Sequence, residues 1–362
     1  MQQSVLGSDD RNARKAMPSG STFFIKLIAF FRDSAMGENT SVASIETGEL
    51  RVPPDMISIT GGSFRMGSDK HYPEEAPAHA VTVGDFWIDR TPVTNRQFRK
   101  FVNATGHVTV AEIKPNADDY PGALPHMLKA GSLVFTPPKG QVDLRDWSQW
   151  WNFKFGADWR RPYGPRSSVS GLDDHPVVHV AYRDAEAYAR WAGKELPTEA
   201  EWEFAARGGL DGAEFAWGAD FTPGGKHMAN TWQGEFPRQN LATDGHERTS
   251  PVTAFPPNGY GVHDMIGNVW EWTTDWYSSK HTADAKKACC VPENPRGGRE
   301  ADSYDPCQPQ IKIPHKVIKG GSHLCAPNYC RRYRPAARHA EAVDTSTSHL
   351  GFRCVMRERK AS

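Results

Sequence analysis

Alternation of apolar and polar side chains predicts short β-strands at the start of the folded region. Over residues 56–67, apolar side chains alternate with polar ones around the pair Gly61–Gly62. Such alternation on both sides of a glycine turn is typical of two strands joined as a hairpin. The stretch 79–88 alternates in the same way and predicts one further strand.

Three helices are predicted where an apolar stripe follows a polar start residue and ends at glycine. The first follows Thr94 and ends before Gly106, the second spans residues 183–192, and the third follows Thr198 and ends before Gly208. We expect the second and third helices to pack together beneath the sheet. Beyond Gly208, turn residues recur every few positions, so the sequence predicts no further helix and little regular structure there.

The N-terminal part of the chain differs from the rest in composition. Residues 1–54 mix Ser, Gly, Asp and Arg without a sustained period and end at Pro53–Pro54, so we expect a flexible N-terminal tail. Residues 55–362 show no further boundary and are interpreted as a single domain. With 32 Gly, 27 Pro and 12 Trp in the chain, a loop-rich globule held by buried aromatic side chains is favoured over a helical bundle or a doubly wound sheet.

Charge and hydropathy exclude some classes of partner. Lys plus Arg and Asp plus Glu both number 43, so no strong field favours nucleic acid or an acidic membrane surface. The sequence has no run of about 18 apolar residues for a membrane span. The most apolar stretch, residues 23–31, contains Lys26 and is not followed by a small-residue cleavage site, which argues against secretion. We therefore expect a cytoplasmic protein that binds neither nucleic acid nor membranes.

The six cysteines are too few for a disulfide scaffold in a chain of 362 residues. Cys325 and Cys330 lie five positions apart beside Gly320–Gly321 and several arginines. Nearby cations favour the thiolate, and two soft sulfur ligands without a third Cys or His at regular spacing suit copper(I) better than zinc. The spacing alone is also consistent with a structural disulfide or with two buried free thiols.

Two further stretches combine hard oxygen donors with turn residues. One spans residues 258–276 and contains Asp264 and Glu271, and the other contains Asn230 and Asp244. Calcium prefers such a mixture of carboxylate and carbonyl ligands. Acidic residues that only cap turns would give the same pattern, so both interpretations stay open.

Three stretches of the sequence together resemble one protein family. Residues 196–209, 258–276 and 317–354 closely resemble the formylglycine-generating enzyme (sulfatase-modifying factor) family, in particular bacterial-type members, and the likeness runs from about residue 56 to 357 in consistent order. It implies an α+β fold with little regular secondary structure, related to C-type lectin domains, as one catalytic domain over 55–362. It also implies a groove for an extended Cys-X-Pro-X-Arg segment of an unfolded or nascent sulfatase.

The family's activity implies a role for the paired cysteines. Members oxidise the cysteine of that segment to Cα-formylglycine with molecular oxygen, and we expect a thiol reductant to take part. By resemblance, Cys325 and Cys330 hold copper(I), and the substrate thiol joins them as a third sulfur. Ser322, Trp270 and Tyr329 match residues that line this site, where a hydroxyl can hold oxygen or water and an indole can shield the metal. Ordinary packing and turn hydrogen bonds are the alternative for these three.

The resemblance also implies two calcium sites that order the helix-poor half of the chain. Each combines side-chain oxygens with main-chain carbonyls. The first consists of Asn230, Asp244 and the carbonyls of Thr231 and His246. The second consists of Asp264, Glu271 and the carbonyls of Gly267 and Val269.

The chain departs from the family at two bridging cysteines of its vertebrate members. Ala206 stands where the partner of the cysteine matching Cys354 lies, and Pro335 replaces another bridging cysteine. Loss of both bridges fits a reducing compartment and hence the cytoplasmic interpretation. In the Pro/Gly-rich loop we expect free thiols, with a Cys307 disulfide or metal site as the alternative; the residues are Cys289, Cys290 and Cys307.

Two other functional classes share this fold. Nonheme-iron sulfoxide synthases carry an added helical domain with a His-rich iron motif, and residues 1–50 have neither the length nor the histidines for one. A lectin-like binding module without catalysis would hold Cys325 and Cys330 as a plain disulfide. His323 lies two positions before Cys325 and is interpreted as a packing residue rather than a ligand.

Overall fold

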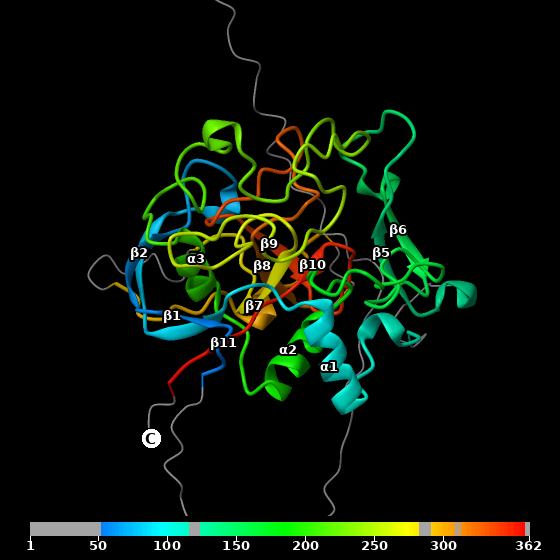
Figure 1. Ribbon diagram of the computed structural model, residues 1–362, viewed down its shortest axis with the longest axis horizontal. Coiled ribbons are helices and arrows are strands. Elements are labelled where there is room, and N and C mark those ends of the chain that lie inside the picture. The colour runs from blue at the N-terminus through cyan, green and yellow to red at the C-terminus, as the bar shows by residue number, and fades with distance from the viewer. Residues whose placement is uncertain (1–51, 116–123, 282–290, 308–310, 312, 359–362) are drawn as a thin grey trace, which may run out of the picture.

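The computed structural model (Figure 1) describes residues 52–115, 124–281, 291–307, 311 and 313–358. Within these ranges lie the helices α1 (Asn95–Thr105), α2 (Tyr182–Trp191) and α3 (Glu199–Arg207). Nearly all of the predicted tail, as well as Cys289 and Cys290, lies outside the described residues. None of the helices in the described ranges has the length and apolar character required to cross a bilayer.

All three helices lie within one position of where the sequence signals place them. Before α1, the Thr94 hydroxyl accepts a hydrogen bond from the Gln97 main chain, and the Gln97 side chain accepts one from the Thr94 main chain. Gly106 closes α1 with a φ of 69°, a left-handed conformation that glycine adopts without strain. Thr198 and Gly208 cap α3 in the same two ways.

In the described residues the strands form two sheets and two hairpins. A three-stranded antiparallel sheet has the order β1 (Met56–Ile59), β4 (Phe86–Asp89) and β11 (Val355–Met356). The central sheet has the order β10 (Leu350–Gly351), β7 (Trp270–Trp276), β8 (His315–Lys319) and β9 (Arg338–Ala342), with β10 and β7 parallel. The hairpins are β2 (Gly62–Met66) with β3 (His79–Val83), and β5 (Gly131–Phe135) with β6 (Trp151–Phe155). This architecture confirms the predicted α+β class.

The predicted hairpin over residues 56–67 is wrong. β1 pairs with β4 and β2 pairs with β3, so the strands on either side of Gly61–Gly62 belong to different sheets. At Gly61 an added Cβ would lie 2.3 Å from a carbonyl oxygen of β3, so this glycine permits a close crossing of two backbones rather than a turn. The predicted single strand 79–88 is likewise divided, at Gly84–Asp85, into β3 and β4.

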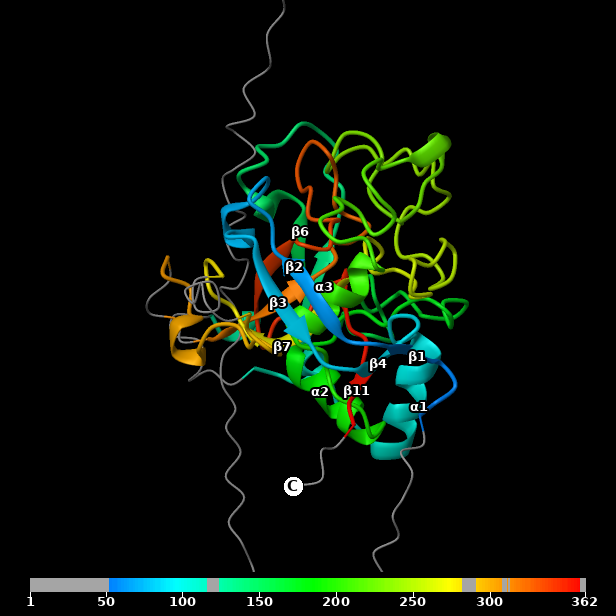
Figure 2. The same ribbon diagram turned by 90° about the vertical axis from the view of Figure 1, so that its left-hand side faces the viewer.

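The expectation that the second and third helices pack together is also wrong. α2 packs against α1, where the rings of Phe98 and Tyr188 stack with centroids 6.0 Å apart. α3 packs instead against β2, β3, β7 and β8 (Figure 2), and every one of its residues is buried. A helix that is buried on all sides has no single apolar stripe to indicate its neighbours.

The C-terminal part of the chain contains more regular structure than predicted. No α-helix follows α3 in the described residues, as expected, but the whole central sheet lies in this part. Its two faces have different characters, because alternate residues of a strand point to opposite sides. The face toward α3 aligns Glu271, Lys319 and Arg338, and the opposite face aligns Trp272, Ile318 and His339.

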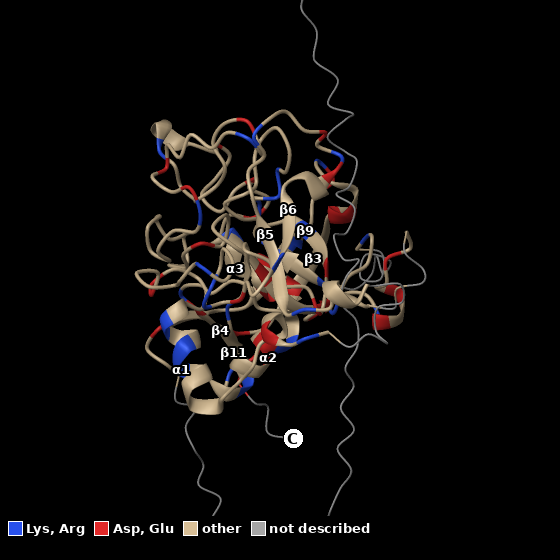
Figure 3. Ribbon diagram, turned by 90° about the vertical axis from the view of Figure 1, so that its right-hand side faces the viewer, with Lys and Arg blue, Asp and Glu red and all other residues tan. Residues whose placement is uncertain are grey.

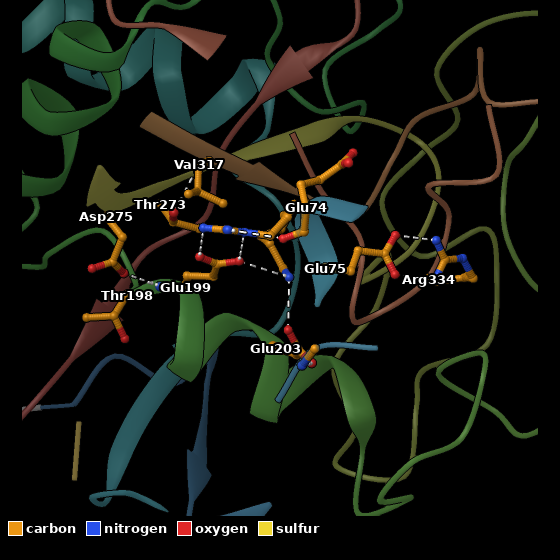
Figure 4. A network of polar contacts seen from close by, with 12 residues as sticks. Glu74, Glu75, Thr198, Glu199, Glu203, Thr273, Asp275, Val317 and Arg334 are labelled. Atoms are coloured by element: carbon orange, nitrogen blue, oxygen red, sulfur yellow. Dashed lines mark hydrogen bonds and ion pairs between the residues drawn. The ribbon is translucent and has the colours of Figure 1, made fainter. Parts of the chain in front are cut away.

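Buried charges join α3 to the central sheet (Figure 4). Arg338 on β9 donates to both carboxylate oxygens of Glu199 at 2.8 Å. Lys319 on β8 lies 3.0 Å from Glu203, which also pairs with Arg207 at 2.7 Å. All five side chains are buried. An intact buried pair adds little net stability, but loss of one partner leaves an uncompensated charge in the interior.

The charges of the whole molecule are balanced rather than segregated. Basic and acidic residues number 43 each, and Figure 3 shows them interspersed over the elements of that view. Recognition by this protein therefore depends on local groups rather than on one dominant field.

Arg338→Met is expected to lower the free energy of unfolding by about 3–5 kcal/mol, because it leaves the Glu199 carboxylate buried without its main partner. Urea unfolding followed by tryptophan fluorescence measures the change. Arg190→Met is the matched control, since Arg190 pairs with Glu186 on the exposed side of α2 and such a pair contributes about 0–1 kcal/mol. Equal losses in the two variants would contradict the role given to the buried network.

Candidate functional site

The paired cysteines lie in the connection between β8 and β9, residues 320–337, which we call the Cys loop. The sulfur atoms of Cys325 and Cys330 are 3.2 Å apart, and both residues are buried. Because a disulfide bond is only about 2.05 Å long, the two residues are free thiols in contact. Of the alternatives that the spacing left open, the structure therefore contains the free thiols and not the disulfide.

Backbone geometry explains how the loop brings the two sulfur atoms together. Gly320 has a φ of 92°, and an added Cβ there would lie 3.1 Å from the Trp202 ring. The chain can therefore turn sharply over α3 only at a glycine. The Cys330 main chain then donates to the Ala326 carbonyl at 2.8 Å, which closes one turn between the cysteines and places their side chains together.

The pKa values of the two thiols are shifted in opposite directions. The hydrogen-bond contact with Cys325, together with the Arg332 guanidinium, outweighs burial and lowers the pKa of Cys330 to about 6. Burial and the neighbouring Cys330 raise the pKa of Cys325 well above its ordinary value. At neutral pH the pair therefore consists of one thiol and one thiolate. Arg332 is itself buried and pairs with Glu74 at 2.6 Å.

The sulfur atoms lie in the wall of a pocket of about 70 Å³, which Ser322, Trp270 and Tyr329 also line. The Ser322 main chain donates to the Cys325 sulfur at 3.4 Å, and its hydroxyl accepts a main-chain hydrogen bond of 3.2 Å from two positions further on. The Tyr329 ring stacks on Phe236 with centroids 4.5 Å apart. The structure thus brings together all the residues that the sequence nominates for catalysis.

A larger pocket of about 200 Å³ adjoins the first, and Leu324 lines both. Its walls include the cations Arg238 and Arg248. His323 also lines this larger pocket, and its Nδ1 atom lies 2.8 Å from the Asn268 carbonyl oxygen. Burial lowers the pKa of His323 to about 4, so the imidazole is neutral and held by the main chain, in keeping with its interpretation as a packing residue.

Two predicted ligands of the first calcium site, the Thr231 carbonyl and Asp244, lie within reach of one side chain. Asn230 is buried, and its Oδ1 atom has no hydrogen-bond partner. The Gln233 amide donates to the Thr231 carbonyl and, at 2.7 Å, to Asp244 Oδ2, so a donor group lies where these oxygens meet. The His246 main chain donates to Asp244 Oδ1 at 2.9 Å within the same turn. A carboxylate and a carbonyl that share one donor, together with an unpaired buried oxygen on the same segment, fit a bound cation.

The second predicted calcium site fits a cation less completely. Asp264 Oδ1 is buried without a partner, and burial raises the pKa of this carboxyl to about 7; both observations suit a nearby cation. Glu271, however, already accepts two hydrogen bonds of 2.7 Å from Arg353 and one of 2.8 Å from Trp202. Its charge is therefore compensated within the protein. The other predicted ligands are carbonyls on the connecting turn, those of Gly267 and Val269.

Comparison with known proteins identifies the family. Residues 42–358 match the family described as Sulfatase-modifying factor enzyme 1-like domain. A Mycobacterium tuberculosis protein named formylglycine-generating enzyme is 55% identical over 302 residues, which cover 83% of this chain and 97% of that protein. The chain belongs to the formylglycine-generating enzyme family.

The formylglycine-generating enzyme family also includes a protein named as inactive. The mouse protein Inactive C-alpha-formylglycine-generating enzyme 2 is 37% identical over 308 residues, covering 83% of this chain and 85% of that protein. Among solved structures, PvdO from Pseudomonas aeruginosa matches with a TM-score of 0.55 and 26% identity, over 84% of this chain and 94% of that one. Family membership therefore fixes the fold, whereas activity has to be argued from the Cys loop.

In this member of the formylglycine-generating enzyme family, several polar residues of the pocket are not indicated by the sequence. In the sequence, Arg332 is only one of several cations near the cysteines. In the structure it is buried and is the partner of Cys330. His339, Glu341 and His349 line the smaller pocket. The period of two along β9 places residues 339 and 341 on one face, and this is the signal that could have found them.

The remaining described cysteines are free thiols. Cys307 is exposed, as expected for the Pro/Gly-rich loop, and Cys354 is buried. Ala206 is buried on α3. Ion pairs of Arg353 with Glu271 and of Arg357 with Glu201 hold the segment around β11 without a disulfide.

In the metal-free protein, alkylation of Cys330 is expected to show a midpoint near pH 6. Arg332→Met is expected to move this midpoint upward, because the positive charge that favours the thiolate is lost. Mass spectrometry of initial alkylation rates against pH measures both values. Arg331→Met is the matched control, since Arg331 is exposed and pairs with Glu214. A Cys330 midpoint at the ordinary value of about 8.5 would contradict the assignment.

Proposed function

We propose that this protein oxidises the cysteine of a Cys-X-Pro-X-Arg segment in sulfatases to Cα-formylglycine and thereby activates them. Family membership supports this reaction class. The observation that carries the proposal is the pair of free thiols in contact at the wall of a pocket. A purely structural role for Cys325 and Cys330 would be served by a disulfide, which the structure does not contain.

The donor set of the Cys loop fits copper(I). Two sulfur atoms converge in a buried site where one of them is a thiolate, and soft thiolates favour copper(I). In the part of the chain that the structure describes, no group of three or more His, Cys, Asp or Glu side chains is arranged to hold a metal, so a tetrahedral zinc site lacks its further ligands. Copper(I) held by Cys325 and Cys330 would supply the redox centre at which the substrate thiol and molecular oxygen meet.

The residues around the thiol pair prepare the pocket for this reaction. Arg332 places a positive charge beside sulfur atoms that carry negative charge in a buried environment, which offsets part of their desolvation cost. Trp270 is 4% exposed and closes the sheet side of the pocket against water. The stacked ring of Tyr329 is fixed in place, and burial raises the pKa of its hydroxyl, so the phenol stays neutral.

The overall reaction balances with a thiol reductant. One substrate thiol, one molecule of oxygen and two reductant thiols give one aldehyde, one hydrogen sulfide, one water and one disulfide of the reductant. Oxygen accepts four electrons, two from the substrate carbon and two from the reductant. We propose that the physiological reductant is of this thiol class.

The two adjoining pockets suit an extended substrate. Five residues of extended chain span roughly 16 Å, which is more than the smaller pocket can hold. The larger pocket continues past Leu324 and offers both apolar walls and charged groups. A segment buried in a folded sulfatase could not enter, so an unfolded or nascent chain is the proposed partner.

A cytoplasmic location is part of the proposal. Cys354 is a free thiol in the core, and Ala206 removes the family's bridging partner. A protein built without these bridges keeps its fold in a reducing compartment, where disulfides are rare.

Aerobic incubation of a Cys-X-Pro-X-Arg peptide with the copper(I)-loaded protein and a thiol reductant is expected to convert –CH₂–SH to –CHO, detected by mass spectrometry. Cys325→Ser and Cys330→Ser are each expected to abolish conversion, because a hydroxyl is a poor ligand for a soft ion. Cys354→Ser is the control and should keep turnover, since Cys354 is a buried free thiol that is not among the residues lining the pocket. Full activity of either Cys-loop variant would show that the copper assignment is wrong.

Chelation of calcium is expected to lower the melting temperature, because an ion present at a hundred times its Kd stabilises the native state by about 2.7 kcal/mol. Asp244→Asn and Asp264→Asn test the two sites separately, and each should lose part of the calcium-dependent shift in scanning calorimetry. Asp143→Asn serves as the control, since Asp143 is an exposed partner of Arg145. A melting curve that chelation leaves unchanged would remove both calcium sites from the proposal.

A further inference from the structure

β9 presents different side chains on its two faces. Arg338 points toward α3 and pairs with Glu199, whereas His339 and Glu341 line the pocket of about 70 Å³ that contains the thiol pair. On β8, Lys316 is the residue directly opposite Glu341. Glu341 is thus a carboxyl group in the wall of the proposed reaction pocket, and the reaction described so far does not use it.

The neighbouring strand does not neutralise Glu341. Lys316 donates instead to the Thr274 carbonyl at 2.6 Å, and its Nζ atom lies 3.3 Å from the centre of the Trp276 ring. Burial raises the pKa of the Glu341 carboxyl to about 8, although the Thr345 side chain and a main-chain group donate hydrogen bonds to it. At neutral pH the group is therefore an uncharged acid with an O–H to donate.

The other titratable groups around Glu341 leave it in this state. Burial lowers the pKa of His339 to about 3 and that of His349 well below its ordinary value, so both imidazoles are neutral. Burial raises the pKa of the Asp344 carboxyl well above its ordinary value, so ionisation of this neighbouring group is disfavoured as well. Lys316 lies opposite Glu341 on β8, and Glu341 acts electrostatically on Asp344. The other titratable or charged groups that line the same pocket are Cys325, Tyr329, Cys330, Arg332, His339 and His349.

The proposed reaction consumes protons inside this pocket. The two electrons from the reductant must be matched by two protons at oxygen. Cys325 and Cys330 have to be deprotonated to hold a soft metal ion, and the neutral imidazoles of His339 and His349 keep only an N–H that is a very weak acid. The Tyr329 hydroxyl is a phenol, whose ordinary pKa of about 10 makes it a weak acid at neutral pH. Of the groups that line the pocket, Glu341 matches what general acid catalysis requires, a proton held with an affinity near the working pH.

We propose that Glu341 is the proton donor of this pocket. Its carboxyl O–H bond breaks, and the proton passes directly or through one water to the oxygen atom that leaves as water. The carboxylate then takes up a proton from solvent and delivers the second proton in the same way; oxidation of the two reductant thiols releases two protons to solvent, which balances the transfer. The electrons come from the thiol reductant. A pocket of about 70 Å³ holds only a few water molecules, so the transfer path is short. This inference rests on the proposed function.

Glu341→Gln keeps the shape of the side chain and removes its acidic proton. For the copper(I)-loaded protein, kcat on the peptide at pH 7 is expected to fall about 100-fold, within the range that general acid catalysis contributes, while KM and copper(I) affinity stay unchanged. In the unmutated protein, kcat is expected to decline as pH rises through about 8, because the donor is then ionised. The variant is expected to lack this alkaline decline.

Asp344→Asn is the matched control, since Asp344 is a neighbouring buried carboxyl that is not among the residues lining the pocket. It should keep the alkaline decline in kcat. The folded state holds the Glu341 proton more tightly than the unfolded state. The stability contribution of this group is therefore fully present only below the ordinary glutamate pKa of about 4.3, and it is lost progressively until pH has risen through about 8. Glu341→Gln should therefore melt no lower than the unmutated protein above that pH, which separates loss of function from loss of fold.

Infrared difference spectroscopy of the metal-free protein gives a readout that does not depend on turnover. A protonated carboxyl band at pH 7 that disappears in Glu341→Gln is expected. Absence of that band would overturn the proposal whatever the activity. An unchanged kcat and pH profile in Glu341→Gln, with the unmutated protein active, would overturn the proton-donor role alone. No conversion by the unmutated protein would refute the proposed function and this inference with it.

Discussion

Buried ion pairs tie the Cys loop to segments that are remote in the sequence, and the geometry of the site depends on them. Arg332 pairs with Glu74 across 258 positions and Arg334 with Glu75 across 259. The Cys loop has no regular secondary structure of its own, so planar guanidinium groups that bind carboxylates in a fixed geometry set its path. These ion pairs, rather than a helix or a strand, therefore fix the position of the two thiols.

The two faces of the central sheet carry ionisable residues with different roles. On the face toward α3, Arg338 pairs with Glu199 and Lys319 pairs with Glu203, so these buried charges compensate each other. On the other face, Glu341 enters the pocket without a matching cation from β8. Residues of one strand alternate between its two faces. Along β9, Arg338 therefore pairs with α3, whereas His339 and Glu341 line the pocket.

Local sequence signals predicted the helices correctly. The strand partners were not predicted, because they depend on pairing between distant parts of the chain. Caps such as Thr94 with Gln97 act within one turn, so the ends of the helices could be read from the chain. Alternation shows which side chains are buried but is the same for any partner strand, which is why the hairpin at Gly61–Gly62 was predicted wrongly. The resemblance predicted the thiol pair. The pairing of Glu271 with Arg353, 82 positions away in the sequence, could be found only in the folded structure.

The three-stranded sheet joins both ends of the described chain, because β11 pairs with β4 and β4 pairs with β1. During synthesis the N-terminal part of the chain leaves the ribosome first. Glu75 and the strands near it are therefore made before Arg334 and β11, with which they pair. A partly synthesised chain leaves this acidic residue, buried in the finished protein, in contact with water. The pocket with the thiol pair therefore cannot reach its final geometry until the Cys loop and β11 have been synthesised.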